Sequence, residues 1–278
     1  MTRPAIQRWA AFSDDPAGGN PAGVVLGADI LTDAEMQRIA ADVGYAETAF
    51  ISGDGRDRGI RYFSPVAEVP FCGHATVASA VALAEDLGDG AFVFRTPVGP
   101  VEITTTSTVG RRASFTSVEP WVSELAAADL DAVLALLGIV RADLDPRHPP
   151  RLAFAGNPHP LIVLADVAVF DAFRFDPAAA RALMDAAAWP ATIIVLHDRG
   201  GGDWDARNVF PVGTLSEDPA TGAAAAATGA YLRSTGAVSP PALVRISQGR
   251  HVGRPGLLEV AIPAAGGITV TGAAVRIG

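Results

Sequence analysis

Apolar and polar residues alternate along several segments of the chain, and elsewhere the apolar positions recur at helical spacing. Residues 5–12 alternate as a strand, and 24–27 form its partner after a Gly/Asn/Pro turn. Thr32 opens a Thr-Asp-Ala-Glu capping box, and the apolar positions that follow have helical spacing until Gly44. Further strands are predicted at 46–52, 60–63, 92–96, 101–106, 112–116, 151–155, 160–165, 192–196, 206–210, 242–247, 256–262 and 268–276.

Two predicted helices, at 74–87 and from Thr221 to about Ser234, are apolar on every side. A helix without a polar face must be buried all round, and a strongly curved sheet wrapped around it meets that requirement. Two further helices are expected at about 127–137 and about 177–187. The predicted fold class is therefore α+β, with mostly antiparallel strands around one central helix in each half of the chain.

Two near-copies of one pattern run through the sequence. Gly19–Pro21 leads into an apolar strand and Cys72–His74 opens the first apolar helix, while Gly156–Pro158 and Asp218–Gly222 do the same in the second half. A repeat at this scale predicts two pseudo-symmetric lobes.

A change of pattern at Glu119-Pro120-Trp121 marks the predicted boundary between these lobes. The N-terminal lobe is expected to span 1–118, completed by about 268–278, and the C-terminal lobe to span 119–267.

The composition of the chain limits the kinds of partner that the protein could bind. A formal net charge of −9 argues against nucleic acid, because phosphate binding requires a basic face. No apolar run approaches the roughly 18 residues that a spanning helix needs, so no membrane partner is expected. The start, Met1-Thr2-Arg3-Pro4, lacks the apolar region of a signal peptide, and a cytoplasmic location is expected.

The usual signals of metals and cofactors are missing from the sequence. A single cysteine, Cys72, excludes an internal disulfide and a cysteine-rich metal site. The five histidines are scattered without metal-ligand spacing, so no metal is predicted. Neither a dinucleotide-binding fingerprint, a Walker A loop nor a nucleophile elbow is present, and no organic cofactor is expected.

The starts of the two apolar helices are the candidate binding site. A helix start offers unpaired N–H groups and the positive end of a dipole, so two such starts facing each other would bind a small anionic metabolite. The residues concerned are Gly73, His74, Thr221, Gly222 and Ala223. The alternative interpretation is local: His74 could cap its helix or satisfy a buried backbone group, and Gly73 could be a turn residue.

Four polar side chains are candidates for the chemistry, each with a structural alternative. Glu47 lies within an apolar strand, either on its solvent face or partly desolvated, with a raised pKa suited to proton transfer. Asp218 could cap the second helix or orient a ligand. Cys72 could be a small buried residue or an activated thiolate, and Asn20 a turn residue or a ligand contact. Glu217, beside Asp218, is expected to be exposed, and His159 to be structural.

Six sequence blocks in a fixed order carry a family resemblance. The blocks lie at Gly19–Leu26, Glu47–Phe50, Arg61–Pro65, Glu68–Thr76, Gly156–His159 and Glu217–Gly222, and together they resemble the PhzF-like phenazine biosynthesis family. The resemblance implies the diaminopimelate epimerase fold, an active site between two lobes and a homodimer. It also implies isomerisation of a dihydro-hydroxyanthranilate by relocation of a proton, without metal or organic cofactor.

The resemblance carries roles over to individual residues. Glu47 matches the family's proton-transferring glutamate, Gly73 and His74 match the glycine and histidine that line the site, and Asp218 matches the aspartate across the cleft. Ala223 stands where the family's phenazine enzyme has a serine. The hydroxyl that would bind the substrate is therefore missing, which argues against the phenazine precursor as the substrate.

Three functional hypotheses follow from these residues. The first is a cofactor-independent isomerase that moves a proton on a small carboxylate-bearing metabolite, with Glu47, His74 and Asp218 as its catalytic residues. The second is an amino-acid epimerase or racemase that pairs Cys72 with Glu47. The two-cysteine mechanism of the epimerases is unavailable, because Pro219 and Ala220 stand where the second thiol would be. The third is a metabolite-binding protein without turnover.

Overall fold

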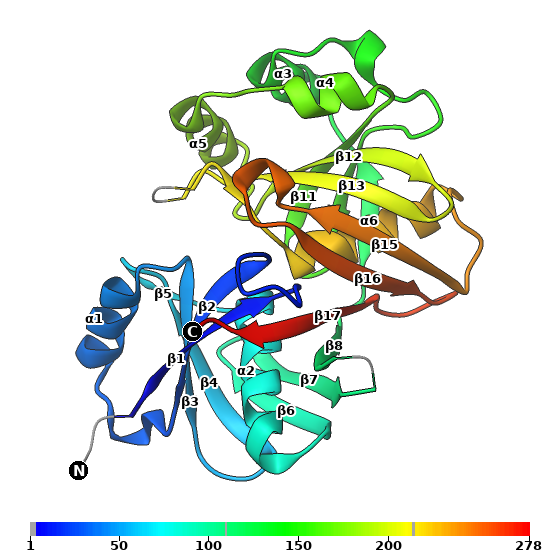
Figure 1. Ribbon diagram of the computed structural model, residues 1–278. Coiled ribbons are helices and arrows are strands. Elements are labelled where there is room, and N and C mark those ends of the chain that lie inside the picture. Colours follow the sequence, from blue (N-terminus) through cyan, green and yellow to red (C-terminus); the bar gives the residue numbers. More distant parts are fainter. Residues whose placement is uncertain (1–3, 109, 213–214) are drawn as a thin grey trace. The chain divides into compact units, whose positions relative to one another are not determined.

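The computed structural model describes residues 4–108, 110–212 and 215–278 of the chain (Figure 1). The first three residues, on which the expectation about a signal peptide rests in part, lie outside that description. The chain forms two compact units: unit 1 comprises Met1–Thr116 and Thr271–Gly278, and unit 2 comprises Ser117–Val270. Each unit mixes strands and helices, so the chain has a mixed α+β fold, as the sequence predicts.

In unit 1 the strands form a ring of neighbours. The strand order β8-β17-β1-β2-β3-β4-β6-β7 returns to β8, with parallel pairs at β2–β3 and β4–β6. The short strand β5 pairs with β4. The bounds of these strands are β1 Ile6–Ala11, β2 Asn20–Leu26, β3 Glu47–Ser52, β4 Asp57–Phe63, β5 Glu68–Val69, β6 Gly90–Thr96, β7 Gly99–Thr106, β8 Arg112–Thr116 and β17 Thr269–Arg276.

Helix α2, Gly73–Leu87, is the centre of this unit. It contacts β1, β2, β3, β7 and β8, and its residues from His74 through Ala84 are all buried. Most of these side chains are small, so strands can approach the helix closely from several sides. The helix predicted at 74–87 is thus present and is buried from His74 to Ala84, whereas Glu85, Asp86 and Leu87 at its end are exposed.

Two other helices of unit 1 lie between β2 and β3: the short 3-10 helix η1, Ala28–Ile30, and α1, Asp33–Val43. The predicted capping box is present, because the Thr32 hydroxyl accepts from the Glu35 N–H and the Glu35 carboxylate accepts from the Thr32 N–H. Gly44 ends α1 in the left-handed conformation that favours glycine.

Unit 2 repeats the pairing order of unit 1. In unit 1 the pairs are β2–β3 parallel, β3–β4 antiparallel, β4–β5 antiparallel and β4–β6 parallel. In unit 2 the corresponding pairs are β11–β12 parallel, β12–β13 antiparallel, β13–β14 antiparallel and β13–β15 parallel. The strands of unit 2 are β9 Trp121–Glu124, β10 Arg151–Phe154, β11 Pro158–Leu164, β12 Ile193–Gly200, β13 Asp203–Val209, β14 Glu217–Asp218, β15 Ala242–Gln248 and β16 Gly256–Ile262.

The buried helix of unit 2 is α6, Gly222–Ser234, which contacts β9, β10, β11 and β16. It follows β14 as α2 follows β5, so each buried helix begins just after a two-residue strand. A second apolar cluster, including Leu134, Phe170 and Met184, is built by α3, α4 and α5 against β11 and β12. The remaining helices of this unit are α3 Ala127–Leu137, η2 Arg141–Asp143, α4 Val167–Ala172, α5 Pro177–Ala186 and η3 Arg250–Val252.

The structure differs from the predicted elements mainly at short strands. Strands β5, β9 and β14 are not predicted, because two to four residues show too little alternation to identify a strand. Helix α4 is also missed, for it has only six residues. The segment predicted as a turn before residue 24 is largely strand, because β2 already begins at Asn20.

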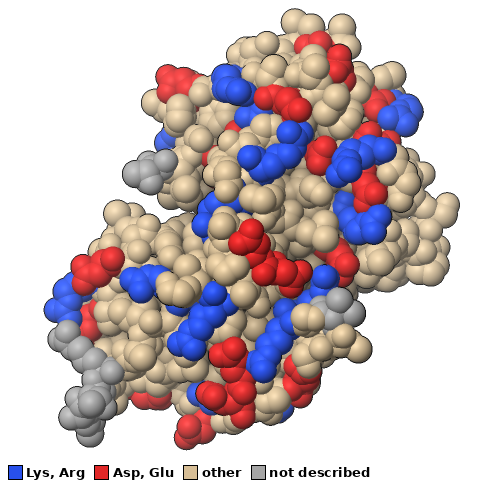
Figure 2. Space-filling view, viewed as in Figure 1, with Lys and Arg blue, Asp and Glu red and all other residues tan. Residues whose placement is uncertain are grey.

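Acidic and basic side chains are interspersed on the face of the molecule that Figure 2 displays. Several of the exposed charges pair across neighbouring strands, as Arg95 does with Asp57 in unit 1 and Arg245 with Asp203 in unit 2. Such exposed pairs contribute little to stability. Among the described residues, none of the helices has both the length and the apolar character needed to cross a bilayer.

Burial of α6 makes Gly229 intolerant of a side chain. A Cβ atom there would lie 2.7 Å from Ile268 Cγ2 and 2.9 Å from Val260 Cγ1. Both neighbours are β-branched and stiff. Alanine favours helix by about 1 kcal/mol over glycine, but overpacking a core costs about 1–3 kcal/mol. We expect Gly229→Ala to lower the free energy of unfolding by roughly 1–2 kcal/mol, measured by urea denaturation.

The control for this variant is Ser234→Ala, because Ser234 is the exposed last residue of the same helix. That change should alter the unfolding free energy by less than about 0.5 kcal/mol. A Gly229→Ala protein as stable as the wild type would show that the core around α6 is loosely packed.

Candidate functional site

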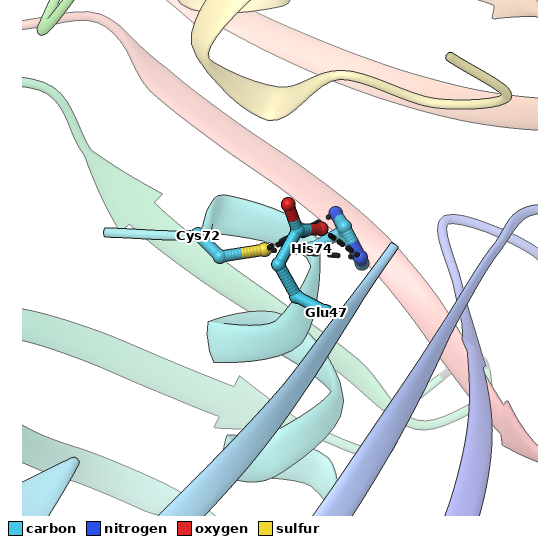
Figure 3. A group of neighbouring side chains, drawn as sticks. All are labelled: Glu47, Cys72 and His74. Carbon is cyan, nitrogen blue, oxygen red and sulfur yellow. Dashed lines mark hydrogen bonds and ion pairs between the residues drawn. The ribbon is translucent and has the colours of Figure 1, made fainter. Parts of the chain in front are cut away.

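The first residues of β2, β3 and α2 lie close together in unit 1 and bring the candidate residues together. Strands β2 and β3 run parallel with Ala22 beside Glu47, so both begin at the same edge of the sheet. Helix α2 packs on both strands and begins at Gly73, with Cys72 as its N-cap residue. Glu47 from β3 and the first turn of α2 therefore lie side by side, as Figure 3 shows.

Glu47, Cys72 and His74 form a compact triad of polar atoms. Glu47 Oε2 lies 3.5 Å from His74 Nε2 and 3.5 Å from Cys72 Sγ. Cys72 Sγ lies 3.4 Å from His74 Nδ1 and 3.7 Å from Nε2. Cys72 and His74 are buried, and the Glu47 side chain is 14% exposed. The Glu47 carboxylate is thus partly buried rather than on an open strand face.

Asn20 orients the imidazole of His74 from the other side. Its Nδ2 lies 3.2 Å from His74 Nδ1 across 54 residues of sequence, and both side chains are buried. With the Asn20 amide in this orientation, Nδ1 accepts and the ring proton lies on Nε2, toward Glu47. The sequence most simply predicts a turn residue at Asn20; the structure makes it a buried partner of the histidine instead.

Burial decides the charge of His74. Loss of water around the ring lowers its pKa to about 3, because the protonated form is the one that burial penalises. The Glu47 carboxylate would favour a protonated ring, but desolvation is the larger effect here. His74 is therefore a neutral hydrogen-bonding group at physiological pH, and its contact with Glu47 is a hydrogen bond rather than an ion pair.

A buried hydroxyl chain fixes the helix start beneath this triad. The Thr76 hydroxyl donates to the Cys72 backbone oxygen at 2.6 Å, and Tyr62 Oη lies 2.6 Å from Thr76 Oγ1. Burial raises the pKa of Tyr62, which stays a neutral phenol. Neither Tyr62 nor Thr76 is predicted from the sequence as a site residue. A threonine four residues after the helix N-cap is the one local signal that could have indicated Thr76.

The equivalent position in unit 2 has different chemistry. Asp218 is buried, and its Oδ2 accepts from the Thr221 hydroxyl at 2.5 Å. Gln248 Nε2 donates to the Asp218 backbone oxygen at 2.7 Å and lies 3.0 Å from Thr221 Oγ1, while its Oε1 accepts from the Thr221 N–H at 3.2 Å. Thr221 precedes Gly222, the first residue of α6, so this network holds the start of that helix.

Gln248 is a site residue that the sequence does not indicate. It ends β15, and Gly249 follows at a φ of +88°. A Cβ atom at Gly249 would lie 2.4 Å from the Pro219 backbone oxygen, so only glycine lets the strand end approach the start of α6 this closely. The Gln248-Gly249 pair was the feature of the sequence that could have indicated this site residue.

Glu217 is a correction to the sequence prediction. It is buried rather than exposed, and its Oε1 lies 2.5 Å from Arg207 Nη2. Arg207 also donates to the backbone oxygens of Phe170 and Phe173. Strand β14 pairs with β13, which places the two charges together where sequence spacing could not show it. His159 is buried with Nδ1 3.0 Å from the Thr192 backbone oxygen, which fits the structural role expected of it.

The triad in unit 1 also has the composition of a metal-ligand set. One ligand atom from each of Glu47, Cys72 and His74 lies within 4.8 Å of the other two. The spacing of the histidines in the sequence does not predict this ligand set. Cys72 and His74 come from one helix start, and Glu47 comes from a strand 25 residues before Cys72. The site of unit 1 thus offers a carboxylate, a thiol and a neutral imidazole at a helix start, and the site of unit 2 offers a second carboxylate at another.

Comparison with known proteins agrees with this description. A family model described as phenazine biosynthesis-like protein matches residues 9–277. The chain is 33% identical over 285 residues to an uncharacterised isomerase, YddE, of Escherichia coli O157:H7, covering 98% of this chain and 96% of that protein. It is 30% identical to the trans-2,3-dihydro-3-hydroxyanthranilate isomerase of Pseudomonas aeruginosa, covering 92% of this chain and 89% of the relative.

Among solved structures, a phenazine biosynthesis protein of the PhzF family from Bacillus anthracis superposes with a TM-score of 0.86 at 26% identity. The match covers all of this chain and 98% of the other. Both the sequence and the structural matches therefore extend over nearly the whole length.

The lowered pKa of His74 predicts a pH-dependent stability. The unfolded chain binds a proton at this residue below about pH 6.5, whereas the folded protein does not until about pH 3. The stabilisation is complete above pH 6.5 and is lost as the pH falls. For His74 alone we expect a loss of roughly 2 kcal/mol between pH 7 and pH 5, which His74→Gln should remove. Urea denaturation at a series of pH values measures it.

Ser79→Ala is the matched control, because Ser79 is buried in the same helix and has no titratable group. That variant should keep the pH dependence of the wild type, whatever its stability. An unchanged slope in His74→Gln would mean that the folded protein protonates His74 readily.

Proposed function

This chain belongs to the phenazine biosynthesis-like (PhzC-PhzF) family, and from that premise we propose that it relocates a proton on a small carboxylate-bearing metabolite. Its relatives over nearly the full length are named isomerases, so the chain is an enzyme of an isomerase family. The proposed reaction needs no organic cofactor, since the family resemblance assigns the proton transfer to a side chain of the protein.

The position of Glu47 carries this proposal. A general base must reach a substrate proton, and a carboxylate that is partly buried beside hydrogen-bonding groups is held in place to do so. The Glu47 carboxylate is 14% exposed and lies 3.5 Å from a neutral imidazole and 3.5 Å from a thiol. In the proposed step it takes a proton from an activated carbon, whose electron pair moves into the adjacent π system. Glu47 then returns the proton to a second carbon, which completes the isomerisation.

His74 and Asn20 are proposed to position Glu47 and the substrate. Asn20 keeps the imidazole in the tautomer that directs its Nε2 proton toward Glu47. A donor at this place stabilises the Glu47 carboxylate before the first transfer and after the second. His74 itself is held neutral by burial, so it acts here as a hydrogen-bonding group.

The residues proposed to bind the substrate carboxylate are the helix-start groups Gly73, Thr221, Gly222 and Ala223, with Asp218 holding a polar group of the ligand. In unit 2 the Thr221 backbone and hydroxyl are fixed by Gln248 and Asp218, which supports a preorganised start of α6. That both helix starts act on one substrate is part of the proposal and rests on the family resemblance.

The distance between Cys72 and Glu47 argues against the epimerase alternative. An acid and a base that act on opposite faces of one carbon must have that carbon between them, each about 3–3.5 Å away. They would therefore stand about 6–7 Å apart. Cys72 Sγ and Glu47 Oε2 are in direct contact at 3.5 Å instead. The two groups suit proton movement on one face of a substrate.

We expect Glu47→Gln to lower kcat by about 10²–10⁴-fold, the usual contribution of a general acid/base, with substrate binding nearly unchanged. Because the substrate is unidentified, the measurement is deuterium uptake from heavy water into a metabolite extract, followed by mass spectrometry. The wild type should label a metabolite that the variant does not.

Glu102→Gln is the control, since Glu102 is exposed on β7 of the same unit. It should label the same metabolite as the wild type. Full labelling by Glu47→Gln would remove Glu47 from the mechanism.

The residue at position 223 allows a test of the substrate. The compound in the name of the Pseudomonas aeruginosa relative is trans-2,3-dihydro-3-hydroxyanthranilate. Ala223 lacks the hydroxyl that the resemblance places there. One hydrogen bond contributes about 0.5–1.5 kcal/mol, so Ala223→Ser should raise kcat/KM for this compound by about 2- to 13-fold. A wild type that already matches the serine variant would show that the hydroxyl is dispensable.

A further inference from the structure

We propose that Glu47, Cys72 and His74 bind a zinc ion, and that zinc at this site switches off the proton transfer assigned to Glu47. The site lies entirely within unit 1. Its ligands are one carboxylate, one thiolate and one imidazole, three groups that zinc commonly binds. Figure 3 shows the three side chains converging from β3 and from the start of α2.

The spacing of the three ligand atoms matches a tetrahedral zinc centre. Zinc bonds of about 2.3 Å to sulfur and about 2.0–2.2 Å to nitrogen and oxygen, at tetrahedral angles, separate the ligands by about 3.4–3.6 Å. The observed separations are 3.5 Å for Sγ to Oε2, 3.7 Å for Sγ to Nε2 and 3.5 Å for Nε2 to Oε2. Sγ also lies 3.4 Å from His74 Nδ1, so it faces the imidazole ring, and a turn of that ring about its Cβ–Cγ bond brings the Nε2 lone pair toward an ion held between Sγ and Oε2.

Charge balance supports a divalent ion at this site. On binding, the Cys72 thiol releases its proton to solvent, so a thiolate and a carboxylate bring two negative charges to the two positive charges of zinc. The third ligand, His74, coordinates zinc as a neutral imidazole and adds no charge. A site without net charge suits these largely buried surroundings, where an unbalanced charge would be costly.

Asn20 supplies the outer contact that a zinc-bound histidine needs. A histidine that ligates through Nε2 carries its proton on Nδ1 and usually donates it to a neighbouring oxygen. Asn20 lies at hydrogen-bond distance from Nδ1. Rotation of its amide by half a turn presents Oδ1 in place of Nδ2, so the same contact serves either tautomer.

The functional consequence rests on the proposed function of Glu47. Zinc bound at Oε2 withdraws electron density from the whole carboxylate, so neither oxygen stays basic enough to take a proton from carbon. With three protein ligands, the fourth position of the ion remains for water or for a substrate carboxylate. Zinc is accordingly an inhibitor of the isomerase rather than its cofactor.

Cobalt(II) binding to the full-length, untagged protein tests the site directly. Tetrahedral cobalt with a thiolate ligand absorbs strongly in the near ultraviolet through charge transfer. Cys72 is the single cysteine of the chain, so this absorption can come from no other residue. We expect saturable absorption in the wild type, its loss on addition of zinc chloride, and its absence in Cys72→Ser. His74→Asn and Glu47→Gln should weaken zinc binding by about tenfold or more, measured by displacement of cobalt.

His251→Gln is the matched control, because His251 lies near the carboxylate of Asp171 without a thiol. It should bind cobalt as the wild type does. Circular dichroism verifies that each variant is folded, and Cys72→Ala replaces Cys72→Ser if the latter is not. A wild type without charge-transfer absorption, or zinc affinity unchanged in the Cys72 variant, would overturn the site.

A separate measurement, deuterium uptake in the presence of zinc, tests the inhibitory role of the ion. Zinc at concentrations that displace all bound cobalt should abolish the deuterium uptake catalysed by the wild type, and continued uptake would overturn that role. Cobalt binding requires no substrate, so its failure refutes the zinc site alone. Full labelling by Glu47→Gln refutes the catalytic role of Glu47, whatever the metal result.

Discussion

Burial of α2 from His74 to Ala84 explains most of the architecture of unit 1. A helix that packs against strands on several sides can carry only small or apolar residues, and its polar side chains must find partners inside. Thr76 and Ser79 do so by donating to carbonyl oxygens four residues earlier. Strand β17 returns from the far end of the chain to pair with both β1 and β8, which closes the sheet around the helix.

Because strands pack against α2 on several sides, the first turn of this helix has a fixed position. Cys72 and His74 therefore stand beside the start of β3, and Glu47 meets them there. The same burial removes water from the imidazole and keeps it neutral, so Asn20 and Glu47 can use its two nitrogens as acceptor and donor. Packing thus creates the chemical state of the site as well as its geometry.

Unit 2 repeats the strand pairing but not the side chains at its helix start. Where unit 1 places a thiol and an imidazole, unit 2 places Asp218, Thr221 and Gln248, which bond to one another. Both units present the start of a buried helix after a two-residue strand. A shared topology with different helix-start residues is what a division between proton transfer and substrate binding would require, and it supports the roles proposed for the two halves.

Features that depend on residues close together in the chain could be predicted before the fold was known. These are the capping box at Thr32, the buried helices at α2 and α6 and the repeat that pairs them, together with the family that the six blocks indicate. Tertiary structure decided what depends on partners far along the chain: the contact of Asn20 with His74, the burial of Glu217 against Arg207, and the approach of Gln248 to Thr221. The physical reason is that hydrophobic spacing reports which face of an element is buried, whereas sheet register alone sets which distant polar group meets it there.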